Sequence, residues 1–140
     1  MFVNAGWGGF ALWCALMRRF VLALAAVLLL AGCGNTYESA KDAATAMGCP
    51  KFVNSGPLEG ANGTVDDTGA CEVNRLDSYA IFVWKDSDKA DDGFKKLRDA
   101  LAPGQVEAVL HDGNWVVLCQ AKKVCADVKD NVGGELVAAQ

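Results

Sequence analysis

The stretch from Val106 to Cys119 reads VEAVLHDGNWVVLC, and it decides the fold. Its two arms are rich in apolar and β-branched residues, which favour strands. Between them, Asp112-Gly113-Asn114 supplies residues that accept the backbone angles of a tight turn. The pattern predicts a β-hairpin, and the elements on either side of it determine the fold class.

A second strand-forming stretch, SYAIFVW, precedes the hairpin at Ser78–Trp84. Its alternate residues fall on opposite faces, with Tyr79, Ile81 and Val83 on one and Ala80, Phe82 and Trp84 on the other. Apolar residues on both faces predict a central strand that is covered on two sides. A shorter strand at Cys71–Val73 comes just before it and completes another hairpin.

Three segments have the features of helices. The first, Tyr37–Met47, is rich in alanine and is followed by Gly48-Cys49-Pro50, a usual helix stop. The second begins at Asp86-Ser87, where Ser87 is the expected cap, and ends before Pro103-Gly104. Its apolar residues recur at helical spacing and should face the core: Ala90, Phe94, Leu97 and Leu101. The third, Lys122–Val132, places valines at four-residue steps, and Gly133-Gly134 ends it.

The order of elements is therefore α-β-β-α-β-β-α. It predicts an α+β fold, in which a small antiparallel sheet of about four strands, arranged in two hairpins, has helices packed on it. We expect a single globular domain over residues 37–140. The stretch Asn54–Ala70 is rich in glycine, asparagine and aspartate, and we expect it to be a solvated loop.

The start of the chain has a different character. From Met17 it reads MRRFVLALAAVLLLAGC, with two arginines before an apolar run of eleven residues at Phe20–Leu30. A helix that spans a bilayer needs roughly 20 apolar residues, so this run is too short to span one. Basic residues followed by a short apolar core are typical of a secretory signal peptide, which we assign to residues 17–32.

The end of that signal, Leu30-Ala31-Gly32-Cys33, resembles the lipobox of bacterial lipoproteins. In that family the cysteine thiol receives a diacylglyceryl group, and the chain is then cut just before the cysteine. The resemblance implies that Cys33 is lipidated, that residues 33–36 form a tether, and that the protein lies on the extracytoplasmic face of the cell membrane. The paired cysteines and the alanine-rich signal also resemble small actinobacterial lipoproteins of uncharacterised function, a likeness that implies no activity.

Residues 1–16 place an apolar segment before the arginines, where a signal peptide needs a short basic end. The preferred explanation is a mis-assigned start, with translation beginning at Met17. One rival is an uncleaved membrane segment over Phe2–Ala31, which would place Arg18 and Arg19 inside the bilayer at about 2.5–3.5 kcal/mol each. A twin-arginine export signal is the other, and the sequence matches it poorly.

Four cysteines remain in the domain: Cys49, Cys71, Cys119 and Cys125. An even number in an exported domain predicts two disulfides. Four cysteines allow three pairings, of which we favour the two local ones, Cys49–Cys71 and Cys119–Cys125. Zinc and free or redox-active thiols are the alternatives. The chain has no Cys-x-x-Cys and a single histidine, so we expect no metal site, and a redox-active pair lacks its motif.

Charge and motifs limit the function classes. Arg18 and Arg19 are the only charged residues before Cys33, so 11 of the 13 basic and all 17 acidic residues follow it, a formal charge of −6. An acidic domain repels phosphate backbones, and we expect no nucleic-acid partner. His111 lies beside the predicted turn and should be exposed. The pairs Asp66-Asp67 and Asp91-Asp92 have no visible reason to be desolvated. We therefore expect no enzyme and no cofactor.

Two tryptophans, Trp84 and Trp115, lie in predicted strands and are the candidate ligand-facing residues, with core packing as the alternative. Two functions follow. The first is a small binding or interaction module anchored to the membrane, with a small ligand or an envelope protein as partner. The second is a structural or accessory lipoprotein that docks on another envelope protein. A pocket walled by either tryptophan favours the first, and a flat apolar surface patch favours the second.

Overall fold

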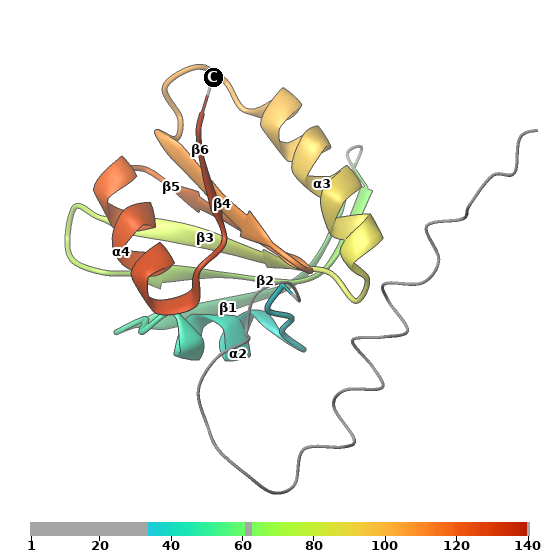
Figure 1. Ribbon diagram of the computed structural model, residues 1–140, viewed down its shortest axis with the longest axis horizontal. Helices are drawn as coiled ribbons and strands as arrows, with labels where there is room; N and C mark the ends of the chain where they lie inside the picture. Colours follow the sequence, from blue (N-terminus) through green and yellow to red (C-terminus); the bar gives the residue numbers. More distant parts are fainter. Residues whose placement is uncertain (1–33, 61–62, 140) are drawn as a thin grey trace, which may run out of the picture. The chain divides into compact units, whose positions relative to one another are not determined.

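The computed structural model describes residues 34–60 and 63–139, and the expected signal peptide and Cys33 lie outside this part of the chain. Helices and strands combine in an α+β fold, with three helices and an open six-stranded antiparallel sheet in the described residues (Figure 1). In chain order the elements are α2 (Ala40–Ala46), β1 (Phe52–Gly60), β2 (Gly63–Glu72), β3 (Ser78–Val83), α3 (Ser87–Ala100), β4 (Ala108–Asp112), β5 (Trp115–Cys119), α4 (Lys122–Val132) and β6 (Glu135–Ala138).

The strands lie in the order β1-β2-β3-β5-β4-β6, and every neighbouring pair is antiparallel. The predicted hairpin is confirmed as β4–β5, in which Asp112 pairs with Trp115 across the two-residue turn Gly113-Asn114. Gly113 has φ +48°, a left-handed angle that glycine adopts without strain. The five residues of β5 are all buried, as expected of a strand next to the middle of the sheet.

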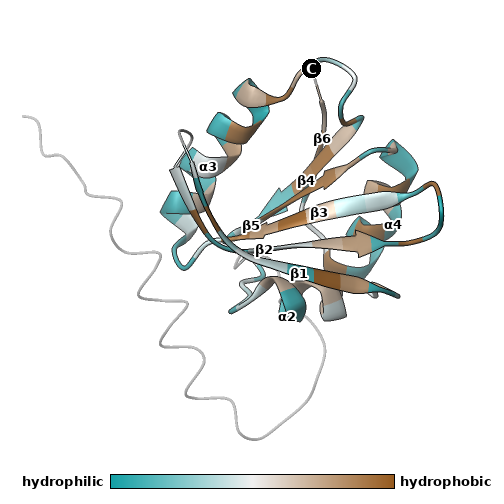
Figure 2. Cartoon of the chain, turned by 180° about the vertical axis from the view of Figure 1, so that it is seen from behind, coloured by the Kyte–Doolittle hydropathy of each residue, from teal (hydrophilic) through white to brown (hydrophobic). Residues whose placement is uncertain are grey.

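Two apolar clusters cover the two faces of the sheet. On one face, the helices α2 and α4 pack on Tyr79, Ile81 and Val83 of β3. On the other, α3 packs on Val109 of β4 and Val116 of β5. Figure 2 shows the apolar residues concentrated along the central strands. The two-sided cover predicted for Ser78–Trp84 is therefore confirmed, and its alternation separates the two clusters.

The prediction of about four strands was too low. The stretch Asn54–Ala70, expected to be a loop, forms most of β1 and β2, and Thr68 Oγ1 donates a hydrogen bond of 2.7 Å to the Gly56 carbonyl between these strands. No alternating apolar pattern marks β1 because nearly all of its residues are exposed, so the strand is held by backbone pairing. The sixth strand, β6, follows the glycines that end α4 and pairs with β4.

All three helices lie where they were predicted, α4 over the predicted residues, whereas α2 and α3 differ in how they start. The first, α2, begins at Ala40 rather than Tyr37, and the Ser39 side chain caps it by accepting from Asp42 N at 3.1 Å. The cap residue of α3 is Asp86, so the expected cap Ser87 is instead the first helical residue. In α4 the three valines at four-residue steps are buried.

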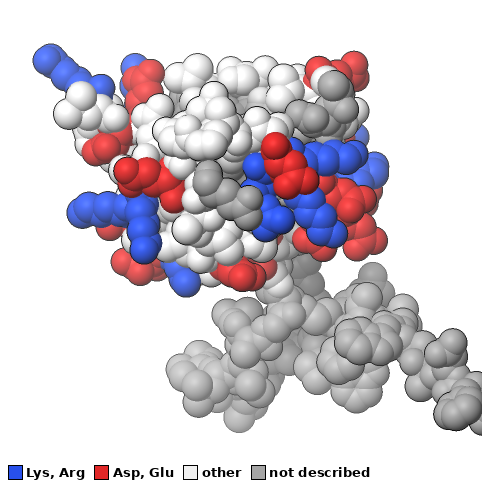
Figure 3. Space-filling model, turned by 90° about the horizontal axis from the view of Figure 1, so that it is seen from above, with Lys and Arg blue, Asp and Glu red and all other residues white. Residues whose placement is uncertain are grey.

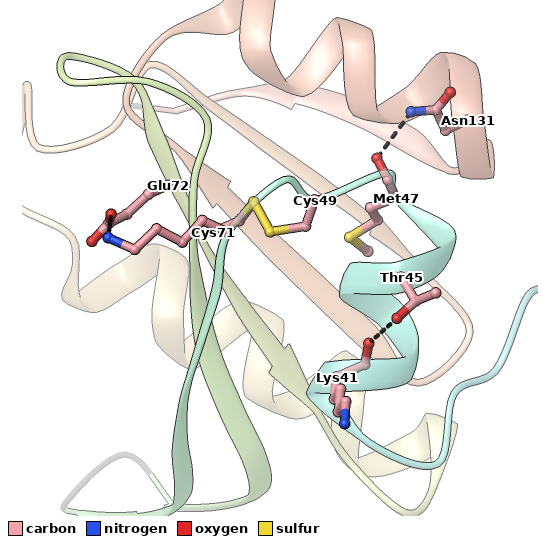
Figure 4. The surroundings of a disulfide bond; sticks show 8 residues. Lys41, Thr45, Met47, Cys49, Cys71, Glu72 and Asn131 are labelled. Atoms are coloured by element: carbon pink, nitrogen blue, oxygen red, sulfur yellow. Dashed lines mark hydrogen bonds and ion pairs between the residues drawn. A yellow bond between two sulfur atoms is a disulfide. The ribbon is translucent and has the colours of Figure 1, made fainter.

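Both local disulfides are present in the structure. The long-loop disulfide, Cys49–Cys71, has a sequence separation of 22 and joins the segment after α2 to the end of β2 (Figure 4). Beside it, Lys51, which immediately precedes β1, pairs with Glu72 at the end of β2. The short-loop disulfide, Cys119–Cys125, has a separation of 6 and joins β5 to α4.

Residues 34–36 lie against the domain instead of forming the expected free tether. Asn35 N donates to Asp112 Oδ2 at 3.1 Å, and Asn35 Nδ2 donates to the Val132 carbonyl at 2.7 Å. The Asn35 carbonyl in turn accepts a hydrogen bond of 2.9 Å from the Trp115 indole. The folded body therefore begins at Gly34, before the predicted boundary at residue 37.

Candidate functional site

A surface hollow of about 450 Å³ lies between the outer part of β2 and the helix α3. Its lining residues are Gly63, Thr64, Asp66, Trp84, Lys89, Asp92, Gly93 and Lys96. The two side walls are exposed residues of β2 and α3, so the hollow is open to solvent. Its volume lies in the range of small-molecule sites, roughly 300–1,000 Å³.

Trp84 forms the floor of this hollow and is held from three directions. Its backbone N donates to the Asn114 carbonyl at 2.9 Å, and its indole Nε1 donates to the Thr64 carbonyl at 3.0 Å. On the helix side, a Cβ at Gly93 would lie 2.3 Å from the Trp84 ring, so the ring packs where only a glycine leaves room. Trp84 is 2% exposed, and it therefore fixes the shape of the floor without offering a ring face for stacking.

The walls of the hollow carry charges of both signs. Lys89, Asp92 and Lys96 share one face of α3, since residues three, four and seven apart lie on the same side of a helix. Lys89 pairs with Asp86 at 3.2 Å. Within residues 34–60 and 63–139, Asp92 and Lys96 have no ion-pair partner. Figure 3 shows basic and acidic side chains interspersed on one face of the molecule.

Asp66 is the acidic residue on the strand side. Its Oδ2 accepts a hydrogen bond of 2.8 Å from Lys85 N, and its Oδ1 lies 3.9 Å from Lys85 Nζ. Its sequence neighbour Asp67 instead accepts from Ala40 N at 2.8 Å, at the start of α2. The two carboxylates thus serve different elements, because successive residues of a strand point to opposite faces.

Trp115 does not face a ligand in the structure. It is 0% exposed and lies in the core on the α2 and α4 side of the sheet, where the Tyr37 ring is 6.0 Å away between centroids. Its indole N–H donates a hydrogen bond to the Asn35 carbonyl. For this residue the structure supports the alternative, core packing.

His111 is half-buried rather than exposed. Its ring stacks on Phe94 of α3 with centroids 4.2 Å apart, and its Nε2 lies 3.9 Å from Glu135 Oε2 of β6. The Arg98 guanidinium lies 5.7 Å from the centre of the same Phe94 ring. The sequence did not reveal this cluster, because it depends on how α3 crosses β4.

Burial perturbs two tyrosines on the other face of the sheet. It raises the pKa of Tyr79 to about 12. Burial, and secondly the charge of Asp112, also raise the pKa of Tyr37. Tyr79 belongs to the apolar cluster on that face, and Tyr37 packs against it.

Comparisons with protein-family models, curated proteins and solved structures find no match to this chain. In the described part of the chain, no helix has the length and apolar character needed to cross a bilayer. The same residues contain no group of three or more histidine, cysteine or acidic side chains arranged to hold a metal ion. The hollow between β2 and α3 is therefore the candidate site, on its geometry alone.

Proposed function

We propose that this protein is a membrane-anchored extracytoplasmic lipoprotein whose domain binds a small polar ligand in the hollow between β2 and α3. The ligand class is a compact molecule that carries both an anionic and a cationic group. The observation that carries the proposal is a pair of opposite charges above the fixed floor of Trp84, Asp92 and Lys96, which have no ion-pair partner among the residues that the structure describes.

A ligand with one charge of each sign is chosen because the walls of the hollow carry both signs. Asp92 and Lys96 lie one helical turn apart, with Cβ atoms about 5–6 Å from each other, so a compact ligand can reach an acceptor and a donor at once. A solely anionic ligand would approach Asp92 and Asp66 unfavourably, and a solely cationic ligand would meet Lys89 and Lys96. A zwitterion avoids both costs. The walls are too polar to favour a mainly apolar ligand.

Binding, rather than catalysis, fits the groups at this site. The described lining residues include no histidine, cysteine or serine, and the one hydroxyl belongs to Thr64. We therefore propose recognition without chemical conversion.

The anchor is proposed on separate grounds. The match of Leu30-Ala31-Gly32-Cys33 to a lipobox supports lipidation at Cys33. Two disulfides in the domain support an oxidising compartment, since such bonds persist outside the cytoplasm. A Cys33→Ala variant should lose membrane association or accumulate as an unprocessed precursor. If it fractionates and migrates like the parent, the lipid assignment is wrong.

The ligand proposal is tested by NMR with diglycine as a zwitterionic probe. Binding should shift the Trp84 indole N–H resonance, because that group forms the floor with Thr64. Diglycine blocked by acetylation and amidation has the same backbone without the two charges, and it should shift nothing. An equal response to both peptides, or to neither at millimolar concentration, would refute the proposed ligand class.

Matched variants on α3 make the test specific. Lys96→Gln and Asp92→Asn each remove one wall charge and should weaken diglycine binding by several-fold. The controls Lys95→Gln and Asp91→Asn make the same changes at neighbouring exposed positions that do not line the hollow. Equal losses in all four variants would show a general charge effect and not a site.

The second candidate function is docking on another envelope protein. The open edge of β1 favours it, because an exposed edge strand offers unpaired backbone groups to a partner strand. Pro57 lies in this strand, and the pairing of β1 with β2 is irregular around Gly56, two features that weaken strand addition. Capture of an envelope protein that is lost when β1 is altered, with no zwitterion binding, would favour this function.

A further inference from the structure

The segment that follows Cys33 is part of the folded body. Asn35 contacts Asp112 and Val132 through hydrogen bonds, and the next two residues continue onto the sheet. Tyr37 N donates to Asn114 Oδ1 at 2.9 Å, and Asn114 Nδ2 donates to the Tyr37 carbonyl at 2.8 Å. The chain is thus held at the β4–β5 turn from its second residue after Cys33 onward.

We propose that this docked segment fixes the orientation of the domain, so that the end of the sheet bearing the β4–β5 turn lies against the bilayer. The inference rests on the proposed lipid anchor at Cys33. Only Gly34 lies between that residue and Asn35, and two residues of extended chain reach about 7 Å. A lipid on Cys33 therefore brings this end, named the anchored end, to the membrane surface.

The anchored end also contains the candidate site. Trp84, the floor of the hollow, is hydrogen-bonded to the Asn114 carbonyl in the β4–β5 turn. The opposite end of the sheet carries the β2–β3 connection, in which Leu76 is 87% exposed. The six residues of β3 separate the two ends by about 17 Å at the usual strand rise. The hollow therefore lies on the membrane-proximal side and Leu76 on the distal side.

Electrostatic attraction does not account for this orientation. At the anchored end the exposed Lys85 and Lys89 lie among Asp66, Asp86 and Asp88, so basic side chains are outnumbered by acidic ones. Anionic lipids would not draw such a surface down. Among the described residues, the docked segment is the feature that holds this end at the membrane, and lengthening the chain between Cys33 and Gly34 should release it.

The test uses the full lipidated protein in phosphatidylcholine vesicles that contain a lipid with a nitroxide on its headgroup. A fluorescent amino acid is placed either at Lys85, which is exposed at the anchored end, or at Leu76. Quenching by the nitroxide falls steeply with distance. We expect quenching at Lys85 to be several-fold stronger than at Leu76.

A flexible Gly-Ser insert of about 12 residues between Cys33 and Gly34 supplies the matched control, since it adds roughly 20 Å of reach. The insert should bring quenching at the two positions close together. Equal quenching without the insert, or an undiminished difference with it, would overturn the orientation. Failure of the protein to float with the vesicles would overturn the lipid anchor itself and the orientation with it.

Discussion

Asn114 joins three parts of the chain, and its replacement should be among the most damaging single changes in the domain. The residue is 4% exposed. The side-chain amide donates to the carbonyls of Tyr37 and Trp84 at 2.8 and 2.6 Å, and its oxygen accepts from Tyr37 N at 2.9 Å. The segment after Cys33, the end of β3 and the β4–β5 turn therefore all depend on one amide.

The expected loss is obtained from these three hydrogen bonds. Asn114→Ala removes them all and leaves three backbone groups without their partner. Each bond contributes about 1 kcal/mol net, and a buried group left unsatisfied costs about 1–3 kcal/mol. Partial access of water to the displaced segment lowers the sum, so we expect a loss of about 3–5 kcal/mol in the free energy of unfolding. That is a large share of the 5–15 kcal/mol typical of a domain.

Asn114→Asp keeps the shape and changes only the chemistry. A carboxylate has no N–H, so its oxygens would face the carbonyls of Tyr37 and Trp84, and repulsion and burial would raise the pKa of the new acid in the folded state. A raised folded-state pKa means that stability is lost as pH rises above the unfolded value of about 4. The variant should therefore have a much lower free energy of unfolding than the parent at pH 7, and the difference should shrink as the pH falls toward 4.

Urea unfolding followed by far-ultraviolet circular dichroism, with the disulfides intact, measures both variants at pH 7 and pH 4. Asn54→Asp is the control, because Asn54 is exposed on β1 and the same substitution there should change stability by less than about 0.5 kcal/mol. The reasoning from these contacts is wrong if the free energy of unfolding of Asn114→Ala lies within about 1 kcal/mol of the parent's. It is also wrong if the stability of Asn114→Asp depends on pH no more than that of the control.

Three further predictions concern packing, disulfides and pH. Gly93→Ala places a methyl group 2.3 Å from the Trp84 ring, so it should destabilise the domain by about 1–3 kcal/mol and shift the indole resonance. The control Gly60→Ala meets no atom within 4 Å and should leave both stability and the resonance unchanged. Equal destabilisation by the two substitutions in thermal unfolding would contradict this prediction. Replacing both cysteines of the long-loop disulfide with alanine should lower the free energy of unfolding by about 3 kcal/mol, and the same change at the short-loop disulfide should lower it by about 2 kcal/mol, because the longer loop restricts the unfolded chain more. If urea unfolding gives the reverse order, the stabilisation does not arise from chain entropy. The pKa of Tyr79 is raised to about 12, so the stability that its protonated hydroxyl contributes should persist below pH 10 and be lost between pH 10 and 12. Tyr79→Phe should flatten this alkaline loss of stability. An alkaline unfolding curve that is the same for the variant and the parent would contradict the prediction.

Sequence patterns predicted the fold well where burial imposes a regular spacing of apolar residues. The strands β3 and β5 lie between two covered faces, so their apolar residues are visible in the sequence. The pattern disappears in β1, which is exposed on both faces and is held by backbone hydrogen bonds that any residue supplies. Glycine and asparagine there indicated a loop because local preferences were the only signal, and pairing with β2 overrode them.

The candidate site was only partly visible in the sequence for a related reason. Trp84 could be singled out by its residue type, and it does form the floor of the hollow. The sequence does not distinguish Asp91 from Asp92, yet Asp92 lines the hollow and its neighbour does not. Which member of such a pair faces a site depends on how α3 packs on the sheet, and no local pattern encodes that crossing.

The folded body has to include residues that precede its first helix, and the reason is chemical. The Trp115 indole N–H is buried, and the carbonyl of Asn35 is its hydrogen-bond acceptor. A domain that began at Tyr37 would leave this donor unsatisfied, at a cost of about 1–3 kcal/mol, and would also lose the bond from Asn35 to Val132. The residues next to the proposed lipid therefore serve as structure and not as spacer, so lengthening the chain before Gly34 should be tolerated while deleting Asn35 should not.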